Sequence, residues 1–241
     1  MKDKKISEEH LENEIIAPEQ ENNAGGIIGF IQKKWKIIAI FFVAIVVLIA
    51  LILMYKANTE QNEYNAAKAL ARIEVYFLNG EYENALFAPD SLPLVRGEKV
   101  IGLIKIINEY ASTKAGERAT LYAADAYYQL AKYNEAKTFY EKSSNSKIPD
   151  IKIGGYAGTA ACNEKEGKLQ LASENYLNAV NLIQDDGLKV RYMYFAGLCN
   201  EKSGKRDEAK KIYRDIIDLN KFGEFSNMAK AGIVRLGDII E

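Results

Sequence analysis

The chain has 241 residues, with 32 lysines and arginines against 33 aspartates and glutamates, so its net charge at pH 7 is −1. From position 57 onward the balance is 25 against 26, which excludes the concentrated basic face of a nucleic-acid-binding protein. The two cysteines are too few for a disulfide scaffold, and their spacing is unlike that of a metal site.

The amino-terminal stretch, residues 1–34, reads as a polar tail followed by an interfacial lead-in. Its first 24 residues are rich in Glu, Lys and Asn and cannot bury enough apolar surface to offset chain entropy, so we expect disorder there. A weak helical pattern from His10 to Ile16 leaves a short partner-binding helix open as an alternative. Gly25 and Gly26 then lead into the apolar segment 27–31, which suits a membrane interface.

An uninterrupted apolar run extends from Ile37 to Tyr55, nineteen residues without a charge. As a helix it would be about 28 Å long, close to the hydrocarbon thickness of a bilayer. We therefore predict a transmembrane helix over residues 35–56. Cationic and aromatic residues suited to the two membrane interfaces flank it: Lys33, Lys34, Trp35, Lys36, Tyr55 and Lys56.

A cleaved signal sequence is the rival interpretation of this run. The run is long for a signal sequence, and residues 54–58 offer no convincing pair of small residues for cleavage, so an uncleaved anchor is favoured. Three basic residues lie within twenty positions on each side, which leaves the orientation undecided by charge alone. Because long domains cross largely regardless of charge, we expect the short tail inside and the carboxyl-terminal domain outside.

The roughly 185 residues after the span suffice for one well-cored domain, residues 57–241. Their apolar residues follow helical periodicity without strand alternation, which predicts an all-α fold. The first helix is expected over 59–78 and ends at Asn79 and Gly80. A short helix over 81–87 stops before Pro89 and Pro93, and another helix is expected near 99–110.

Three similar segments follow at offsets of 36 and 37 residues. Their matching positions are Ala124, Ala131, Tyr133, Ala136 and Tyr140; then Ala160, Gly167, Leu169, Ala172 and Tyr176; then Gly197, Gly204, Arg206, Ala209 and Tyr213. A period of this length with small residues at helix crossings is typical of a helical-hairpin solenoid. The segment NGEYENAL carries the same turn pattern earlier, and FSNMAKAGIVRLG reads as a last helix of the first type.

These spacings resemble the tetratricopeptide repeat over about residues 59–239. No copy has the tryptophan of that family, and the period exceeds 34 residues, so the repeat number and superhelical curvature stay open. The resemblance implies a partner-binding groove lined by the first helix of each pair. The residues that it places there are Leu121, Asp125, Tyr128, Gln129, Tyr194, Leu198, Glu201 and Lys202. They lack the Lys and Asn pattern that clamps the terminal carboxylate of a chaperone.

Cys162 and Cys199 occupy equivalent repeat positions, and we interpret both as small apolar residues buried between helices. A disulfide would need their Cα atoms within about 7 Å, closer than stacked repeats normally allow. A catalytic thiol would need a nearby base, but His10 falls on the other side of the membrane. Most of the fifteen tyrosines are expected to pack between helices with hydroxyls reaching solvent.

No motif indicates catalysis, a metal or a cofactor. The acidic pairs at 8–9 and 185–186 lack surrounding ligands and read as solvated charge. The Gly-Gly pairs at 25–26 and 154–155 lack phosphate-loop spacing and a preceding strand. We therefore expect no cofactor and no enzyme activity.

A short tail, one span and an extracytoplasmic repeat domain also resemble the YfgM-like ancillary subunits of the bacterial Sec translocon. That resemblance implies a protein-binding adaptor anchored in the bacterial inner membrane, with its repeat domain in the periplasm and the Sec channel and periplasmic chaperones as partners. Alternatives are a cell-envelope or division organiser, a self-assembling membrane scaffold and, least favoured, an enzyme.

Overall fold

The computed structural model describes residues 23–219 and 222–239. Within these residues there are ten α-helices and no strand, apart from one isolated bridge between Val95 and Glu98. The all-α prediction is confirmed. The chain divides into two compact units, Met1–Tyr55 and Lys56–Glu241. The predicted tail helix around His10 lies outside the described residues.

The first unit contains the amino-terminal part of helix α1, which is Asn23–Leu78. The most apolar window of its segment Lys34–Leu78 has a mean hydropathy of 3.5, and none of that window is buried against the rest of the protein. This helix is long and apolar enough to cross a membrane, and its position near the amino terminus is equally compatible with a signal sequence.

The residues predicted for the membrane interfaces lie on α1. The side chains of Lys34, Trp35, Lys36, Tyr55 and Lys56 are all exposed. Lys56 also forms an exposed ion pair with Glu60, with 3.9 Å between nitrogen and oxygen. Lys33 belongs to the same helix, but its side chain is not among those described.

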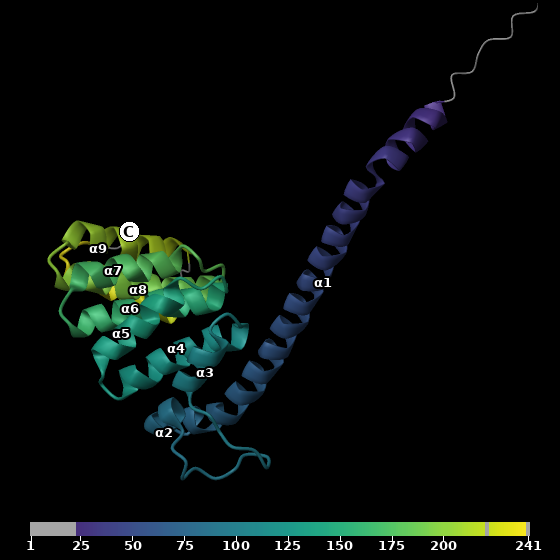
Figure 1. Cartoon of the computed structure of the whole chain (residues 1–241). Helices are drawn as coiled ribbons and strands as arrows, with labels where there is room; N and C mark the ends of the chain where they lie inside the picture. The colour runs from purple at the N-terminus through teal and green to yellow at the C-terminus, as the bar shows by residue number, and fades with distance from the viewer. Residues whose placement is uncertain (1–22, 220–221, 240–241) are drawn as a thin grey trace, which may run out of the picture. The chain divides into compact units, whose positions relative to one another are not determined.

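The second unit begins with residues 56–78 of α1, and Figure 1 shows the helices that follow. From α2 onward each helix packs against the next one along the chain. Their bounds are α2 Tyr82–Phe87, α3 Leu103–Tyr110, α4 Lys114–Gln129, α5 Tyr133–Ser144, α6 Pro149–Lys165, α7 Leu169–Val180, α8 Asp186–Lys202, α9 Arg206–Leu219 and α10 Glu224–Arg235. The segments predicted to repeat become the hairpins α4/α5, α6/α7 and α8/α9, followed by α10. Below, α4, α6, α8 and α10 are called first helices, and α5, α7 and α9 second helices.

One turn geometry ends α1 and all four first helices. The second residue after each of these helices has positive φ: Gly80, Ala131, Gly167, Gly204 and Gly237. Two backbone hydrogen bonds then close each turn, as at Gly167, where residue 167 donates to the carbonyl of 164 and residue 168 to that of 163. This is the Schellman arrangement, which satisfies the last helical carbonyls. Ala131 adopts it at φ 57° although it carries a side chain.

Helix α3 differs from its predicted start near Lys99. Gly102 keeps an extended backbone, with ψ 160°, and the helix begins only at Leu103. A Cβ at position 102 would overlap the backbone of Leu86. The close approach of two segments, which the local sequence does not encode, therefore sets this boundary.

The cysteines lie between helices, as predicted. Cys162 and Cys199 are free and fully buried, and Ala126 is equally buried at the matching position of α4. Burial raises the pKa of Cys162 to about 11 and that of Cys199 to about 12, because desolvation disfavours the thiolate. The interpretation of both as buried, small apolar residues is confirmed.

Candidate interaction groove

A tyrosine on each second helix donates a hydrogen bond to a carboxylate on the preceding first helix. Tyr140 donates to Asp125 Oδ1 at 2.5 Å, Tyr176 to Glu164 Oε2 at 2.8 Å and Tyr213 to Glu201 Oε2 at 2.7 Å. All three rings are buried. The prediction that tyrosine hydroxyls reach solvent is therefore wrong for these three, because the chain provides an internal acceptor for each.

The carboxylates of the two later hairpins also pair with a cation from the next first helix. Glu201 accepts two hydrogen bonds from the Arg235 guanidinium, at 2.9 and 3.0 Å. Glu164 lies 3.9 Å from the Lys202 ammonium. Asp125 differs, since among the described residues no lysine or arginine comes within ion-pair distance of its carboxylate.

The pKa values of these carboxyls diverge accordingly. Hydrogen bonds from Arg235, and secondarily from Tyr213, lower the pKa of Glu201 against the opposing effect of burial. Burial raises the pKa of Asp125, and the Tyr140 hydroxyl only partly opposes this shift. Tyr140, Tyr176 and Tyr213 all have raised pKa values, mainly because they are buried, so they act as neutral donors at physiological pH.

The groove residues predicted on α4 have different surroundings. Leu121 is partly buried and contacts Gly154 of α6. Tyr128 is also partly buried, and its ring lies at centroid distances of 5.3 Å from Tyr133 and 6.5 Å from Tyr140. Gln129 is exposed at the end of the helix. The fourth residue, Asp125, is a partly buried carboxylate that accepts a hydrogen bond from Tyr140 and has no ion-pair partner among the described residues.

The predicted residues on α8 are more closely packed. Tyr194 is only 7% exposed and contacts the rings of Tyr213 and Phe225, so little of its surface is open to a partner. Glu201 is occupied by Tyr213 and Arg235 as described above. Leu198 remains partly exposed and Lys202 is exposed.

Helix α6 links the two predicted sets, because it packs against α4 and is joined to α8 by the pair Glu164 and Lys202. Along one face of α6, Gly154, Gly158 and Ala161 recur at helical spacing, and all three are partly exposed. We use the name inner groove for the set made of Leu121 and Asp125 of α4, these three small residues of α6 and Leu198 of α8; within it, Gly154 packs against Leu121 and Gly158 against the Tyr140 ring.

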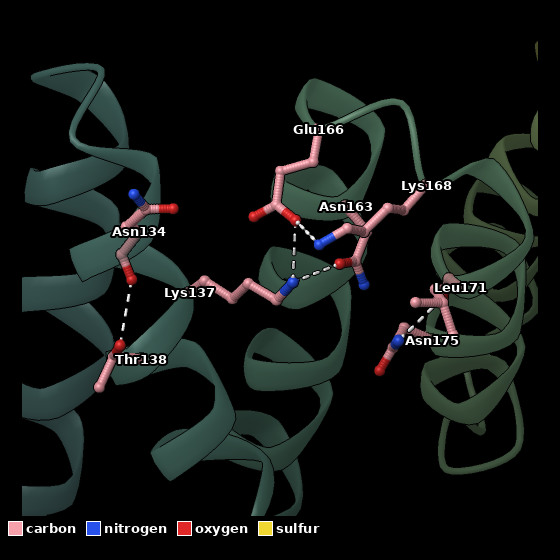
Figure 2. Close-up of polar contacts among 8 residues, drawn as sticks. All are labelled: Asn134, Lys137, Thr138, Asn163, Glu166, Lys168, Leu171 and Asn175. Carbon is pink, nitrogen blue, oxygen red and sulfur yellow. Dashed lines mark hydrogen bonds and ion pairs between the residues drawn. The ribbon is translucent and has the colours of Figure 1, made fainter.

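A separate set of polar contacts joins each second helix to the first helix that follows it or to the residues just after that helix. The sequence did not suggest these contacts. Figure 2 shows the Lys137 ammonium of α5 directed at α6, where it donates to Asn163 Oδ1 at 2.7 Å and to Glu166 Oε2 at 3.1 Å. Lys168 reaches the same carboxylate at 2.7 Å. Farther along the chain, Ser173 donates to the Ala196 carbonyl, and Lys210 pairs with Asp238. The polar groups in these contacts all have partners within the protein, which favours a role in stacking the hairpins.

Helix α1 contributes an acidic cap to α4. The Glu63 carboxylate accepts hydrogen bonds from the amides of Lys114 at 2.7 Å and Ala115 at 3.1 Å, where a helix amino terminus favours negative charge. Next to it is a cavity of about 340 Å³ lined by Glu63, Ala67, Leu70, Ala71, Glu74, Lys114, Ala115 and Arg118. Since Glu63 caps α4 and Glu74 accepts from Tyr122 at 2.8 Å, the cavity's acidic groups already have partners.

The acidic pair at 185–186 is also explained structurally. Asp185 is the N-cap of α8, and its carboxylate accepts from the Leu188 amide at 2.7 Å. Across the described residues, no group of three or more His, Cys, Asp or Glu side chains is arranged to hold a metal ion.

No protein-family model and no curated protein matches the chain.

Proposed function

We propose that the chain is a single-pass membrane protein whose helical domain is a tetratricopeptide-like solenoid that binds other proteins in its inner groove. The observation that carries this proposal is the recurrence of one hairpin geometry. The Schellman turns at Ala131, Gly167 and Gly204 and the tyrosine-to-carboxylate contacts recur in three successive hairpins. Repeated hairpins create extended surfaces that suit a segment of another protein.

The apolar helix supports the anchoring part of the proposal. A fully exposed window of mean hydropathy 3.5 would be unfavourable in water, whereas a bilayer would cover it. Because long domains cross a membrane largely regardless of their charge, the lysines of the short tail count for more than those after the span and favour a cytoplasmic amino terminus, which would place the helical domain in the periplasm of a bacterial cell. Anchoring would confine the groove to a thin layer beside the membrane and raise its effective concentration near membrane machinery.

Within this class we propose an ancillary subunit of the Sec translocon that contacts periplasmic chaperones. A cell-envelope organiser would use the same architecture with different partners. Crosslinking in intact cells followed by purification separates the two, since the first recovers channel subunits and the second recovers wall-synthesis or outer-membrane proteins.

Topology is tested with a carboxyl-terminal tag and external protease, in cells whose outer barrier alone has been opened. Cleavage of the tag while a cytoplasmic marker stays protected supports the proposal. Protection of the tag until detergent is added would place the domain in the cytoplasm and contradict the proposed partners. A tag released to the soluble fraction by signal-sequence cleavage would contradict the anchor.

Self-assembly is a second candidate function, favoured by apolar side chains exposed on and near α10. Phe222 is 92% exposed, and Met228 and Val234 are also exposed. Light scattering of the full chain in detergent measures this directly: a monomer contradicts the scaffold, and a discrete oligomer supports it.

A further inference from the structure

A basic cavity lies in the helical domain between α1 and the turn at residues 95–98. Its volume is about 370 Å³, which falls within the range of small-molecule binding sites. The residues that line it are Tyr64, Lys68, Ala71 and Arg72 of α1 and Arg96 and Glu98 of the turn. The spacing of the four α1 residues places them on one face of the helix. Three of the lining residues are cations and one is a carboxylate, so the lining carries two surplus positive charges.

The single carboxylate of the cavity holds two of the three cations in place. Glu98 lies 2.7 Å from the Lys68 ammonium and 2.7 Å from the Arg72 guanidinium. The Arg72 side chain is only 12% exposed, which fixes it in the cavity wall. Each cation makes one contact with Glu98, and among the described residues no other side chain accepts from either. Most of their N–H donors therefore stay free for a ligand.

The third cation, Arg96, has an unusual backbone and no counter-charge. Among the described residues, no carboxylate lies within ion-pair distance of its guanidinium. Its φ is 54° and that of Gly97 is 77°. The Val95 amide donates to the Glu98 carbonyl at 3.0 Å, and the Glu98 amide donates to the Val95 carbonyl at 3.2 Å, which closes a two-residue hairpin turn.

The conformation of this turn does not favour arginine. Positive φ at both central positions is typical of a turn with the sequence Asn-Gly, and an arginine in place of the asparagine is less stable there. The turn at 95–98 therefore keeps an unpaired arginine beside the cavity at a conformational cost. Backbone strain of this kind is concentrated at functional sites.

A phosphate group is the ligand that suits this lining best. Guanidinium groups bind phosphate oxygens through paired hydrogen bonds, and a lysine ammonium adds a compact charge. Because the cations come from two separate segments, they suit the several oxygens of a phosphate better than the two oxygens of a carboxylate. The exposed hydroxyl of Tyr64 supplies a further donor.

We propose that the cavity between α1 and the turn at 95–98 binds a phosphate group, with Lys68, Arg72 and Arg96 contacting its oxygens. A lipid headgroup and a soluble phosphate ester both present this chemistry. A lipid source depends on the proposed membrane anchor, whereas a soluble source does not. The inference goes beyond the proposed protein-binding function and does not depend on it.

The test uses the full chain in micelles of a neutral detergent, and binding is measured from the rise in unfolding temperature with ligand concentration at constant ionic strength. The probes are glycerol 3-phosphate, dihexanoyl phosphatidylglycerol and, as a carboxylate control, acetate. The test variant is Arg96→Asn, which removes the guanidinium and suits the turn. The matched control is Lys99→Gln, which removes a cation of the same loop that pairs with Asp90 and does not line the cavity.

Wild type and Lys99→Gln should bind at least one of the two phosphate probes, and Arg96→Asn should bind it at least tenfold more weakly. Without ligand, Arg96→Asn should be at least as stable as wild type, because asparagine tolerates positive φ better, so misfolding would not explain the loss. Binding of glycerol 3-phosphate assigns a soluble ester as sufficient, and binding of the lipid alone assigns a headgroup.

Three results would overturn the inference: neither phosphate probe binds, acetate binds as tightly as they do, or Arg96→Asn binds like wild type. Equal weakening in Lys99→Gln and Arg96→Asn would also overturn it, since general charge attraction would then explain the binding. None of these results bears on the protein-binding function, which concerns other helices.

Discussion

The hydroxyl of Tyr213 donates to Glu201 at 2.7 Å, and this pair has the same positions in its hairpin as Tyr176 and Glu164 have in theirs. The contact joins the two helices of one hairpin, while Arg235 extends it to the next first helix. A single carboxylate therefore links three helices. Removing the charge of Glu201 and measuring the change in stability gives the strength of this link.

Glu201→Gln should destabilise the domain at neutral pH by about 1 kcal/mol, a modest value because Arg235 is half-exposed and solvent screens the pair. Since the pKa of Glu201 is lowered in the folded state, its contribution is present above the unfolded pKa and is lost as pH falls through the folded pKa. The difference in thermal unfolding between wild type and variant should therefore shrink toward pH 3. Glu174→Gln, at an exposed position on α7, is the control. A difference independent of pH would contradict this assignment.

Asp125→Asn should have the opposite sign. Burial raises the pKa of Asp125 in the folded state, so this group makes wild type progressively less stable as pH rises from its unfolded pKa to its folded pKa, and the loss is complete above the folded pKa. Asparagine keeps an acceptor for the Tyr140 hydroxyl without the buried charge. We expect a gain of about 0.5–1 kcal/mol at pH 7 that disappears at acid pH. Lower stability of Asp125→Asn at pH 7 would show that the carboxylate is satisfied within the fold.

Ala131→Gly should stabilise the domain by about 0.5–1 kcal/mol, because Ala131 has φ 57° where the other turns carry glycine. The matched reverse change, Gly167→Ala, should cost about 1 kcal/mol, since its φ is 72°. Chemical or thermal denaturation of the two variants gives both values. Equal signs for the two substitutions would refute the shared turn geometry.

Cys162 and Cys199 should resist alkylation in the folded protein, because both are buried and their raised pKa values leave almost no thiolate at neutral pH. Mass spectrometry after iodoacetamide treatment, with and without urea, measures this. Thr138→Cys adds an exposed thiol on α5 as a positive control. Labelling of either native cysteine at the rate of this control would contradict the packing described.

The repeating hairpins could be predicted from sequence because their signals are local. The turn residues Ala131, Gly167 and Gly204 and the buried alanines that follow them recur at fixed spacing, and helical periodicity supplied the rest. The start of α3 could not be predicted, because it depends on the approach of Gly102 to Leu86, sixteen positions earlier in the chain.

Most polar contacts of the candidate groove could not be predicted either, because they also join residues that are far apart in the chain. The acceptor of Tyr140 is fifteen residues away, whereas those of Tyr176 and Tyr213 are twelve away, so no single spacing reveals them. Asp125 was selected by helix position alone. Asp125 stands three residues farther from its turn residue, Ala131, than Glu164 and Glu201 stand from Gly167 and Gly204, so the repeat register does not identify it as their counterpart.

The most direct test of the central claim, that the inner groove binds other proteins, is photo-crosslinking in intact cells. A photoreactive amino acid replaces Leu198 in the inner groove or, as a matched control, Glu174 on a second helix. The account predicts a discrete crosslinked protein from position 198 that is absent at position 174. The same products from both positions, or none from position 198, would contradict it.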